Sequence, residues 1–304
     1  MSTTEATIES SRPGEAIVRP SAVPAASAPD SPPLTTIEPA SGWQLMNVAE
    51  LWSFRELLYF LIWRDVKVRY KQTLLGAAWA VLQPAMMMVV FTIFFARIAR
   101  VPAGDLPYPL FAYAGLLPWT FFSTAISQSA QSVIGSERLI TKVYFPRLAI
   151  PFASIGAAAV DLAIAFGLLL VMMAWYGITP GPSMALVPLI LVCVLLAAAG
   201  VGTLLAALNV AYRDFRYVVP FLVQVWMFAT PTIYMDPSAN GRGTFDYLLA
   251  ANPLSPLVAS FRAAALGGEI EYGPLAIAAV TSLVMFAVGC FYFRTVEDGF
   301  SDII

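Results

Sequence analysis

Long stretches without a charged side chain constrain the fold of this chain more than any other feature. Five of them separate successive Asp, Glu, Lys or Arg residues: 72–96, 106–136, 162–212, 217–235 and 272–293. A bilayer core about 30 Å thick needs about 20 apolar helical residues, so each stretch is long enough to cross it. Only 12% of the residues are charged, against about a quarter in soluble domains. The sequence therefore predicts an all-α integral membrane protein.

Turn residues divide these stretches into six expected transmembrane helices. The Gly177-Ile178-Thr179-Pro180-Gly181-Pro182 segment splits the longest stretch into two crossings. The expected spans are about 75–97, 109–132, 148–176, 184–211, 217–234 and 274–293. After the fifth span, the apolar patches 247–251 and 256–261 are too short to cross. They predict short re-entrant helices, with a plain external loop as the alternative.

Two segments precede the first span. Residues 1–45 hold prolines scattered among Ser, Ala and Thr, which predicts a disordered Pro-rich cytoplasmic tail. Residues 46–72 are expected to form an amphipathic interface helix, because apolar residues from Leu51 to Ile62 recur at helical spacing. Beyond Trp63 the apolar period is ambiguous, and length and context favour continued helix. Residues 73–304 then form the six-helix transmembrane domain.

The distribution of cations predicts the orientation of the spans. Six crossings place both termini on one side of the membrane, and that side receives thirteen of the 17 Lys and Arg residues. Because cytoplasmic loops carry the excess of Lys and Arg, both termini are expected in the cytoplasm.

Several kinds of chemistry are excluded by what the sequence lacks. Histidine is absent, which removes histidine metal sites and the histidine general base. Cys193 and Cys290 are single residues in apolar spans and are expected to be small core hydrophobes. No Gly-x-x-x-x-Gly-Lys-Ser/Thr sequence occurs, so ATP-driven work would need a partner protein.

A basic segment leads directly into the first span. Four cations, Arg64, Lys67, Arg69 and Lys71, fall within eight positions. Such cations are attracted to anionic lipid headgroups, and they suit recognition of a phosphate-bearing lipid. A positive-inside membrane anchor explains them equally well, and Asp65 can pair with Arg69 four residues on.

Aromatic residues and one carboxylate in the spans are candidates for lining a channel. The candidates are Trp79, Tyr113, Trp119, Phe122 and Asp161. Aromatic faces offer stacking surfaces for sugar rings, although aromatics in membrane proteins also serve as packing and interfacial anchors. A charge at the position of Asp161 requires a partner, water or a pore, or else protonation.

The segment between the second and third spans, 137–147, mixes charges with aromatic residues on the cytoplasmic side. Its apolar residues alternate with charged ones on a short predicted helix, as a docking surface for another protein would require. A solvated loop is the alternative.

Specific motifs add a family resemblance. The chain is similar to the permease subunits of ABC type-2 polysaccharide exporters, which carry lipid-linked O-antigen, capsule or teichoic-acid polymers. The resemblance covers roughly residues 50–300 and is carried in order by Trp63-Arg64-Asp65-Val66-Lys67-Val68-Arg69-Tyr70-Lys71-Gln72-Thr73-Leu74-Leu75-Gly76, Trp79, Leu82-Gln83-Pro84, Gly115-Leu116-Leu117-Pro118-Trp119, Thr141-Lys142-Val143-Tyr144-Phe145-Pro146-Arg147, Tyr212-Arg213-Asp214 and Asn252-Pro253-Leu254.

The resemblance implies a homodimer of six-helix subunits in the bacterial inner membrane, paired with two ATP-binding-cassette subunits. The chain would be no enzyme and bind no cofactor of its own, with ATP and Mg on the partner. The cargo would be an undecaprenyl diphosphate-linked glycan, with membrane lipids but no nucleic acid among the other partners. Arg64, Lys67, Arg69 and Lys71 with the Leu75-Gly76 turn would form the gate that receives it. The segment that couples to the ATPase would include Glu137, Arg138, Lys142, Tyr144, Phe145 and Arg147.

Two other functions remain open from the sequence. The same fold could export a drug or a simple lipid, although the basic segment and the aromatic spans favour a polysaccharide. An integral-membrane glycosyltransferase or acyltransferase would need several polar side chains near the bilayer. With no histidine and one carboxylate inside a span, the sequence offers few.

Overall fold

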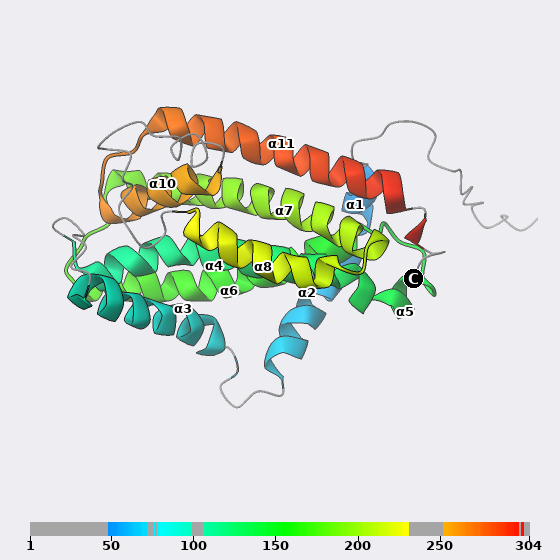
Figure 1. Ribbon diagram of the computed structural model, residues 1–304, viewed down its shortest axis with the longest axis horizontal. Helices are drawn as coiled ribbons and strands as arrows, with labels where there is room; N and C mark the ends of the chain where they lie inside the picture. Colours follow the sequence, from blue (N-terminus) through cyan, green and yellow to red (C-terminus); the bar gives the residue numbers. More distant parts are fainter. Residues whose placement is uncertain are drawn as a thin grey trace, which may run out of the picture. The chain divides into compact units, whose positions relative to one another are not determined.

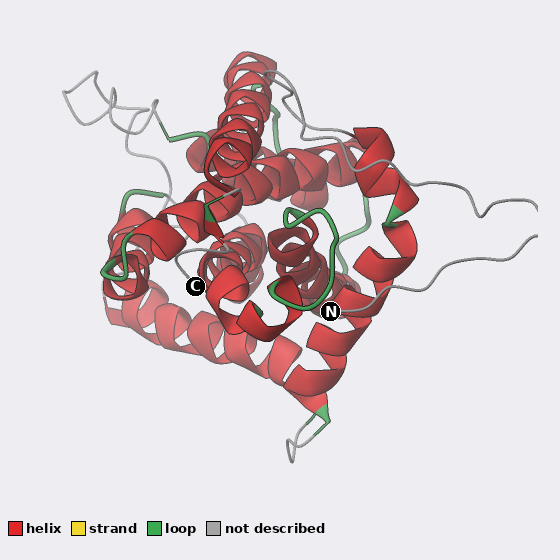
Figure 2. Ribbon diagram, turned by 90° about the vertical axis from the view of Figure 1, so that its right-hand side faces the viewer, coloured by secondary structure: helices red, strands yellow, loops and turns green. Residues whose placement is uncertain are grey.

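A computed structural model shows helices joined by loops, with no strand among the described residues (Figure 2). The described residues are 48–71, 76, 78–98, 106–230, 252–297 and 299–300. All of them belong to the compact unit Trp43–Ile304. The predicted tail, 1–45, lies outside the described residues.

Five helices are long and apolar enough to span a bilayer. They are Ala78–Phe95, formed by α3 (Ala78–Phe91) and the start of the π-helix η1 (Thr92–Ile98); α4 (Tyr108–Gly135); α6 (Ala149–Trp175); Pro182–Ala211, formed by the 3-10 helix η2 (Pro182–Leu186) and α7 (Val187–Ala211); and α11 (Tyr272–Glu297). At a rise of about 1.5 Å per residue, even an 18-residue helix covers about 27 Å. The predicted membrane protein is confirmed.

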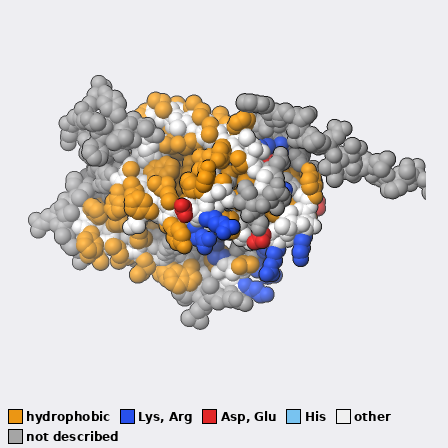
Figure 3. Space-filling model, turned by 45° about the vertical axis from the view of Figure 1, so that its right-hand side comes forward, with side chains coloured by type: hydrophobic (Ala, Val, Ile, Leu, Met, Phe, Trp, Pro, Cys, Tyr) orange, Lys and Arg blue, Asp and Glu red, His pale blue; other side chains and the backbone are white. Residues whose placement is uncertain are grey.

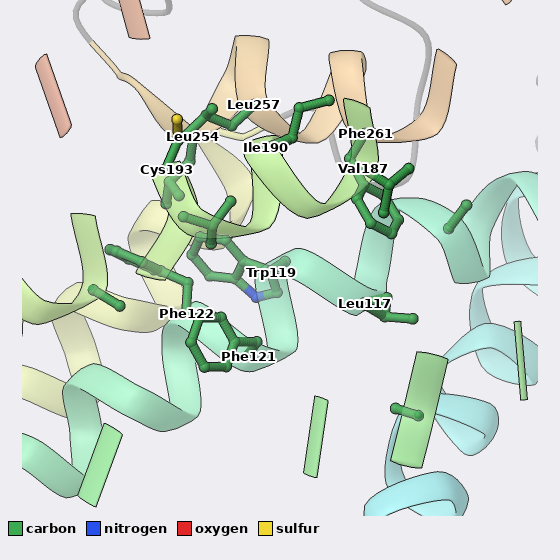
Figure 4. Close-up of a cluster of buried hydrophobic side chains, with 14 of the residues drawn as sticks. Leu117, Trp119, Phe121, Phe122, Val187, Ile190, Cys193, Leu254, Leu257 and Phe261 are labelled. Atoms are coloured by element: carbon green, nitrogen blue, oxygen red, sulfur yellow. The ribbon is translucent and has the colours of Figure 1, made fainter. Parts of the chain in front are cut away.

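The main core lies where α4, α6, α7 and α10 (Leu254–Leu266) meet. Trp119 and Phe122 of α4 lie beneath Ile190 and Cys193 of α7 (Figure 4), and all four side chains are buried. In the most apolar 18-residue window of α4, 78% of the residues are buried. In the span Ala78–Phe95, which contains α3, only 6% of the residues are buried. The α4 helix is therefore the centre of the bundle and α3 lies at its edge.

A second cluster joins one end of the bundle. It packs Leu61 of α2 (Arg55–Tyr70) with Phe145, Val210 of α7 and Phe293 of α11. Arg147 also donates through Nη1 to the backbone oxygen of Glu297 at the end of α11. The ends of α7 and α11 therefore lie together, near α5 (Glu137–Ile140), while α10 and the start of α11 lie at the other end (Figure 1).

Between α7 and α11 the chain runs along the bundle once more. This stretch begins with α8 (Phe215–Phe228), whose 14 residues cover only about 21 Å. At its far end, the Nε1–H of Trp226 donates to Oδ1 of Asn252 at 2.9 Å, just before α10. The predicted fifth span, 217–234, thus corresponds to a helix that is shorter than a bilayer core and begins at Phe215.

Small residues allow the closest helix contact in the bundle, between α7 and α11. A Cβ atom built on Gly289 would lie 2.0 Å from the carbonyl oxygen of Gly200. Only glycine at this crossing lets the two backbones approach so closely.

Other sequence expectations need adjustment at the ends of the elements. The interface helix is interrupted at Phe54, between α1 (Val48–Ser53) and α2, and it continues past Trp63 to Tyr70. The patch 256–261 lies within α10, a buried 13-residue helix, so a plain loop is wrong there. The patch 247–251 lies outside the described residues.

Candidate functional site

The cations of α2 occupy two different faces of the helix. Arg64, Lys67 and Lys71 follow the i, i+3, i+7 spacing that places side chains on one face, and all three are exposed. Arg64 pairs with its neighbour Asp65 at 2.9 Å. The two lysines have no ion pair in the part of the chain that the structure describes. Figure 3 shows Lys and Arg side chains gathered beside a broad hydrophobic surface.

Arg69 points the other way, into the bundle. Its Nη1 pairs with Oδ2 of Asp161 on α6, and its Nη2 donates to Oε1 of Gln128 on α4. The hydroxyl of Tyr70 donates to the other carboxylate oxygen of Asp161. Asp161 thus has the partner that a charge inside a span requires. The alternative in which Asp65 pairs with Arg69 is wrong, because Asp65 is taken by Arg64 and Arg69 by Asp161.

Burial shapes the acid–base properties of this cluster. Removal from water lowers the pKa of the Arg69 guanidinium, and electrostatic interactions with Tyr70 and Asp65 act in the opposite direction. Burial also raises the pKa of the Tyr70 hydroxyl, partly offset by Arg69. Tyr70 therefore remains a neutral hydrogen-bond donor at physiological pH.

A cavity of about 260 Å³ opens beside the cluster. The end of α2, the start of α3, and the middle of α4 and α6 supply its walls, which combine polar, aromatic and aliphatic side chains. Its polar and aromatic side chains include Arg69, Tyr70, Trp79, Gln83, Gln128 and Asp161. The sequence predicted Arg69, Trp79 and Asp161 as site residues. It did not predict Tyr70, Gln83 or Gln128.

Between α2 and α3 the structure describes Lys71 and Gly76, and Leu75 lies outside the described residues. Gly76 has a φ of 51°, a left-handed conformation that glycine adopts without strain and other residues adopt rarely. A glycine is therefore required where the basic helix gives way to α3.

The structure places the remaining candidate channel aromatics in the packed core. Tyr113, Trp119 and Phe122 are each at most 4% exposed. The Tyr113 hydroxyl donates to the backbone oxygen of Ala165 at 2.9 Å, and Phe122 packs edge-on against Trp226. Within this subunit their contacts are with the protein, and a channel-lining role for them stays a prediction.

The candidate coupling segment, 137–147, combines buried anchors with exposed side chains. Phe145 is buried in the second cluster, and Arg147 is half-buried. Tyr144 is 73% exposed, and the other exposed candidates are Glu137, Arg138 and Lys142. Only Glu137–Ile140 is helical. The segment is therefore held firmly on one side and presents a mixed-charge aromatic surface on the other.

The charged and hydrogen-bonding groups of the site can bind a ligand. Cys193 and Cys290 are buried and free of disulfides, as expected for core hydrophobes. Among the described residues, no group of three Cys, Asp or Glu side chains could hold a metal ion. What the site does provide is an exposed basic face next to a hydrogen-bonding cavity.

Comparison with known proteins identifies the family. The family model described as ABC-2 type transporter matches residues 56–266. The O-antigen export system permease protein RfbA of Myxococcus xanthus is 30% identical, over 84% of this chain and 98% of that protein. An RfbA of Klebsiella pneumoniae is 27% identical, over 82% and 95%. The polysialic acid transport protein KpsM of Escherichia coli is 25% identical, over 78% and 92%. The chain belongs to the ABC-2 type transporter family.

Proposed function

We propose that this chain is the membrane subunit of an ATP-driven exporter that moves lipid-linked cell-surface polysaccharide out of the cytoplasm. The observation that carries the proposal is the similarity, over most of the chain, to permeases named for O-antigen export and polysialic acid transport. The proposed location is the bacterial inner membrane, with six crossings and both termini in the cytoplasm. ABC-2 permeases are transport components, so catalysis by this chain is not part of the proposal.

The proposed carrier is undecaprenyl diphosphate. Its phosphates would meet the exposed face of Arg64, Lys67 and Lys71. Among the described residues neither lysine has an ion pair, whereas Arg64 would exchange Asp65 for phosphate. Charge-assisted hydrogen bonds from such donors are the strong ones for phosphate. The turn at Gly76 would let the basic helix meet α3 at the gate where the glycolipid is received.

The proposed energy source is a pair of ATP-binding-cassette subunits that bind ATP and Mg. Their docking site would be the exposed side of 137–147, including Glu137, Arg138, Lys142 and Tyr144. Because Phe145 anchors the segment to the second cluster, a push on its exposed side would be transmitted to α6 as a rigid shift.

The proposed assembly contains a second copy of this chain. The support is the apolar span Ala78–Phe95, which contains α3 and has only 6% of its residues buried within one subunit. A partner copy would cover part of this surface and complete a channel.

Paired variants separate docking from folding. Tyr144→Ala removes an exposed ring and should weaken co-purification with the ATPase while leaving the melting temperature unchanged. Phe145→Ala empties a buried site and should cost about 3 kcal/mol of stability. If Tyr144→Ala co-purifies as well as the unaltered chain, this docking site is wrong.

The function itself is tested by deleting the gene and locating the polymer. The proposal predicts that polysaccharide disappears from the cell surface and accumulates at the cytoplasmic face, where antibodies reach it only after permeabilisation. Unchanged surface polysaccharide combined with increased drug sensitivity would instead favour export of a drug.

A further inference from the structure

We propose that the cavity between α2, α3, α4 and α6 binds a neutral pyranose ring, the sugar residue joined directly to the diphosphate of the cargo. This inference rests on the proposed function and adds to it a carbohydrate site within one subunit, separate from the exposed cations that would hold the phosphates.

The charge balance of the cavity favours a neutral ligand. Arg69 and Asp161 are the charged side chains among the residues that line it, and they pair with each other. A diphosphate placed inside would have to compete with the Asp161 carboxylate for Arg69 and would be repelled by it. A sugar ring brings no charge, and its hydroxyls can hydrogen-bond to both members of the pair without separating them.

The polar lining matches the hydrogen-bonding needs of a sugar. Gln83 and Gln128 each offer an amide that both donates and accepts, and Thr120 and Thr124 add two hydroxyls. A lipid tail could satisfy none of these groups, and covering them with hydrocarbon would cost free energy. These polar groups stand in a mostly apolar wall, a combination that suits a sugar ring, which has apolar C–H faces and hydroxyls at its edge.

An aromatic face completes the site. Trp79 and Gln83 are one helical turn apart on α3, and both line the cavity and are exposed. An indole beside amides offers the combination of stacking and hydrogen bonding that a pyranose uses. Because α3 lies at the edge of the bundle, a ring attached to a lipid can approach this side from the membrane.

The size of the cavity limits the ligand to a single sugar. About 260 Å³ is several times the roughly 30 Å³ that one water occupies in the liquid. It falls just below the range of about 300 to 1,000 Å³ typical of pockets for drug-sized molecules. One ring fits, whereas an oligosaccharide does not.

The position of the cavity matches the chemistry of a lipid-linked glycan. Arg69 and Tyr70 line it, and Lys67 and Lys71 on the same turns of α2 face outward. Lys71 directly follows Tyr70 at the end of α2, so a diphosphate held there would lie beside the cavity and place the sugar bonded to it at the mouth.

The test measures binding of three lipids to the full-length chain in phosphatidylethanolamine–phosphatidylglycerol nanodiscs. The probes are undecaprenol, undecaprenyl diphosphate, and undecaprenyl diphosphate carrying one N-acetylglucosamine. The unaltered chain should bind the glycolipid about tenfold more tightly than the sugar-free diphosphate, as expected from one aromatic contact plus hydrogen bonds.

Variants of residues that line the cavity test whether this difference in affinity depends on the cavity. Trp79→Ala and Gln83→Leu should each reduce the difference to about twofold or less, while affinity for the sugar-free diphosphate stays unchanged. Trp175→Ala and Gln224→Leu are matched controls, since these exposed residues lie away from the cavity. They should keep the full difference. Melting temperatures of all four variants confirm that each is folded.

Three results overturn the inference. Equal affinity of the unaltered chain for both diphosphate lipids, or an undiminished difference in the Trp79 and Gln83 variants, removes the sugar site and leaves the proposed function standing. If neither diphosphate lipid binds better than undecaprenol, the proposed cargo itself is wrong and the sugar site is wrong with it.

Discussion

Replacing Asp161 by alanine removes the carboxylate that accepts hydrogen bonds from both Arg69 and Tyr70. The Arg69 and Asp161 side chains are only 25% and 20% exposed, so the guanidinium left behind is partly cut off from water. Breaking a fully buried pair costs about 3 to 5 kcal/mol, and breaking an exposed pair costs about 0 to 1. This half-buried pair lies between those limits, and we expect Asp161→Ala to lower the free energy of unfolding by about 2 kcal/mol.

A double-mutant cycle isolates the interaction from the other effects of truncation. The free energies of unfolding of Asp161→Ala, Arg69→Ala and the double variant are measured by titrating the purified chain in mixed micelles with dodecyl sulfate. We expect a coupling energy of about 1 to 2 kcal/mol, typical of residues in one hydrogen-bonded network.

The Arg64–Asp65 pair provides a matched control on the same helix. Its side chains are 45% and 23% exposed, and the corresponding cycle should give a coupling of about 0.5 kcal/mol or less. If the Arg69–Asp161 coupling is equally small, the cluster does not hold α2 against α6, and the reasoning from burial is refuted.

Two further variants test the packing of the bundle. Gly289→Ala places a methyl group 2.0 Å from the Gly200 oxygen and should cost about 2 to 3 kcal/mol of stability. Gly167→Ala is the control: a methyl group there meets no atom within 4 Å, so the melting temperature should not fall. Asn252→Ala removes hydrogen bonds to Trp226 and Thr230 at 2.9 and 2.8 Å and should cost about 2 to 3 kcal/mol. A melting temperature unchanged by Gly289→Ala or by Asn252→Ala would contradict the corresponding contact.

The membrane class and most helix limits could be predicted because they depend on local composition. The expected spans 148–176 and 274–293 correspond to Ala149–Trp175 and Tyr272–Glu297. Hydrophobic length and turn residues set these limits, and both are visible in the sequence. The fifth span was overestimated because apolar residues continue beyond Phe228, where α8 ends.

The partners within the site could not be predicted because they are distant in sequence. Asp161 lies 92 positions from Arg69, and Gln128 lies 59 positions away. The local rule favoured Asp65, four residues before Arg69 on the same helix. In the structure, packing of α2 against α6 turns Arg69 into the bundle, and Asp65 pairs with Arg64 instead.

The cavity was missed for a related reason. Trp79 and Gln83 stand one turn apart in the sequence, which indicates a shared helix face. Nothing local shows that this face meets Gln128 and Asp161 from two other helices. Sequence could therefore propose single site residues, while the arrangement that joins them required the fold.

The central claim is tested most directly by transport in a defined system. The chain and an ATP-binding-cassette ATPase that co-purifies with it are reconstituted in sealed vesicles with a lipid-linked polysaccharide, and the fraction of glycan that becomes accessible on the opposite leaflet is measured over time. The account predicts translocation that requires ATP, Mg and both proteins, and that slows when Lys67 and Lys71 are replaced by glutamine. Translocation by the chain alone without ATP, or none by the complete system, would contradict it.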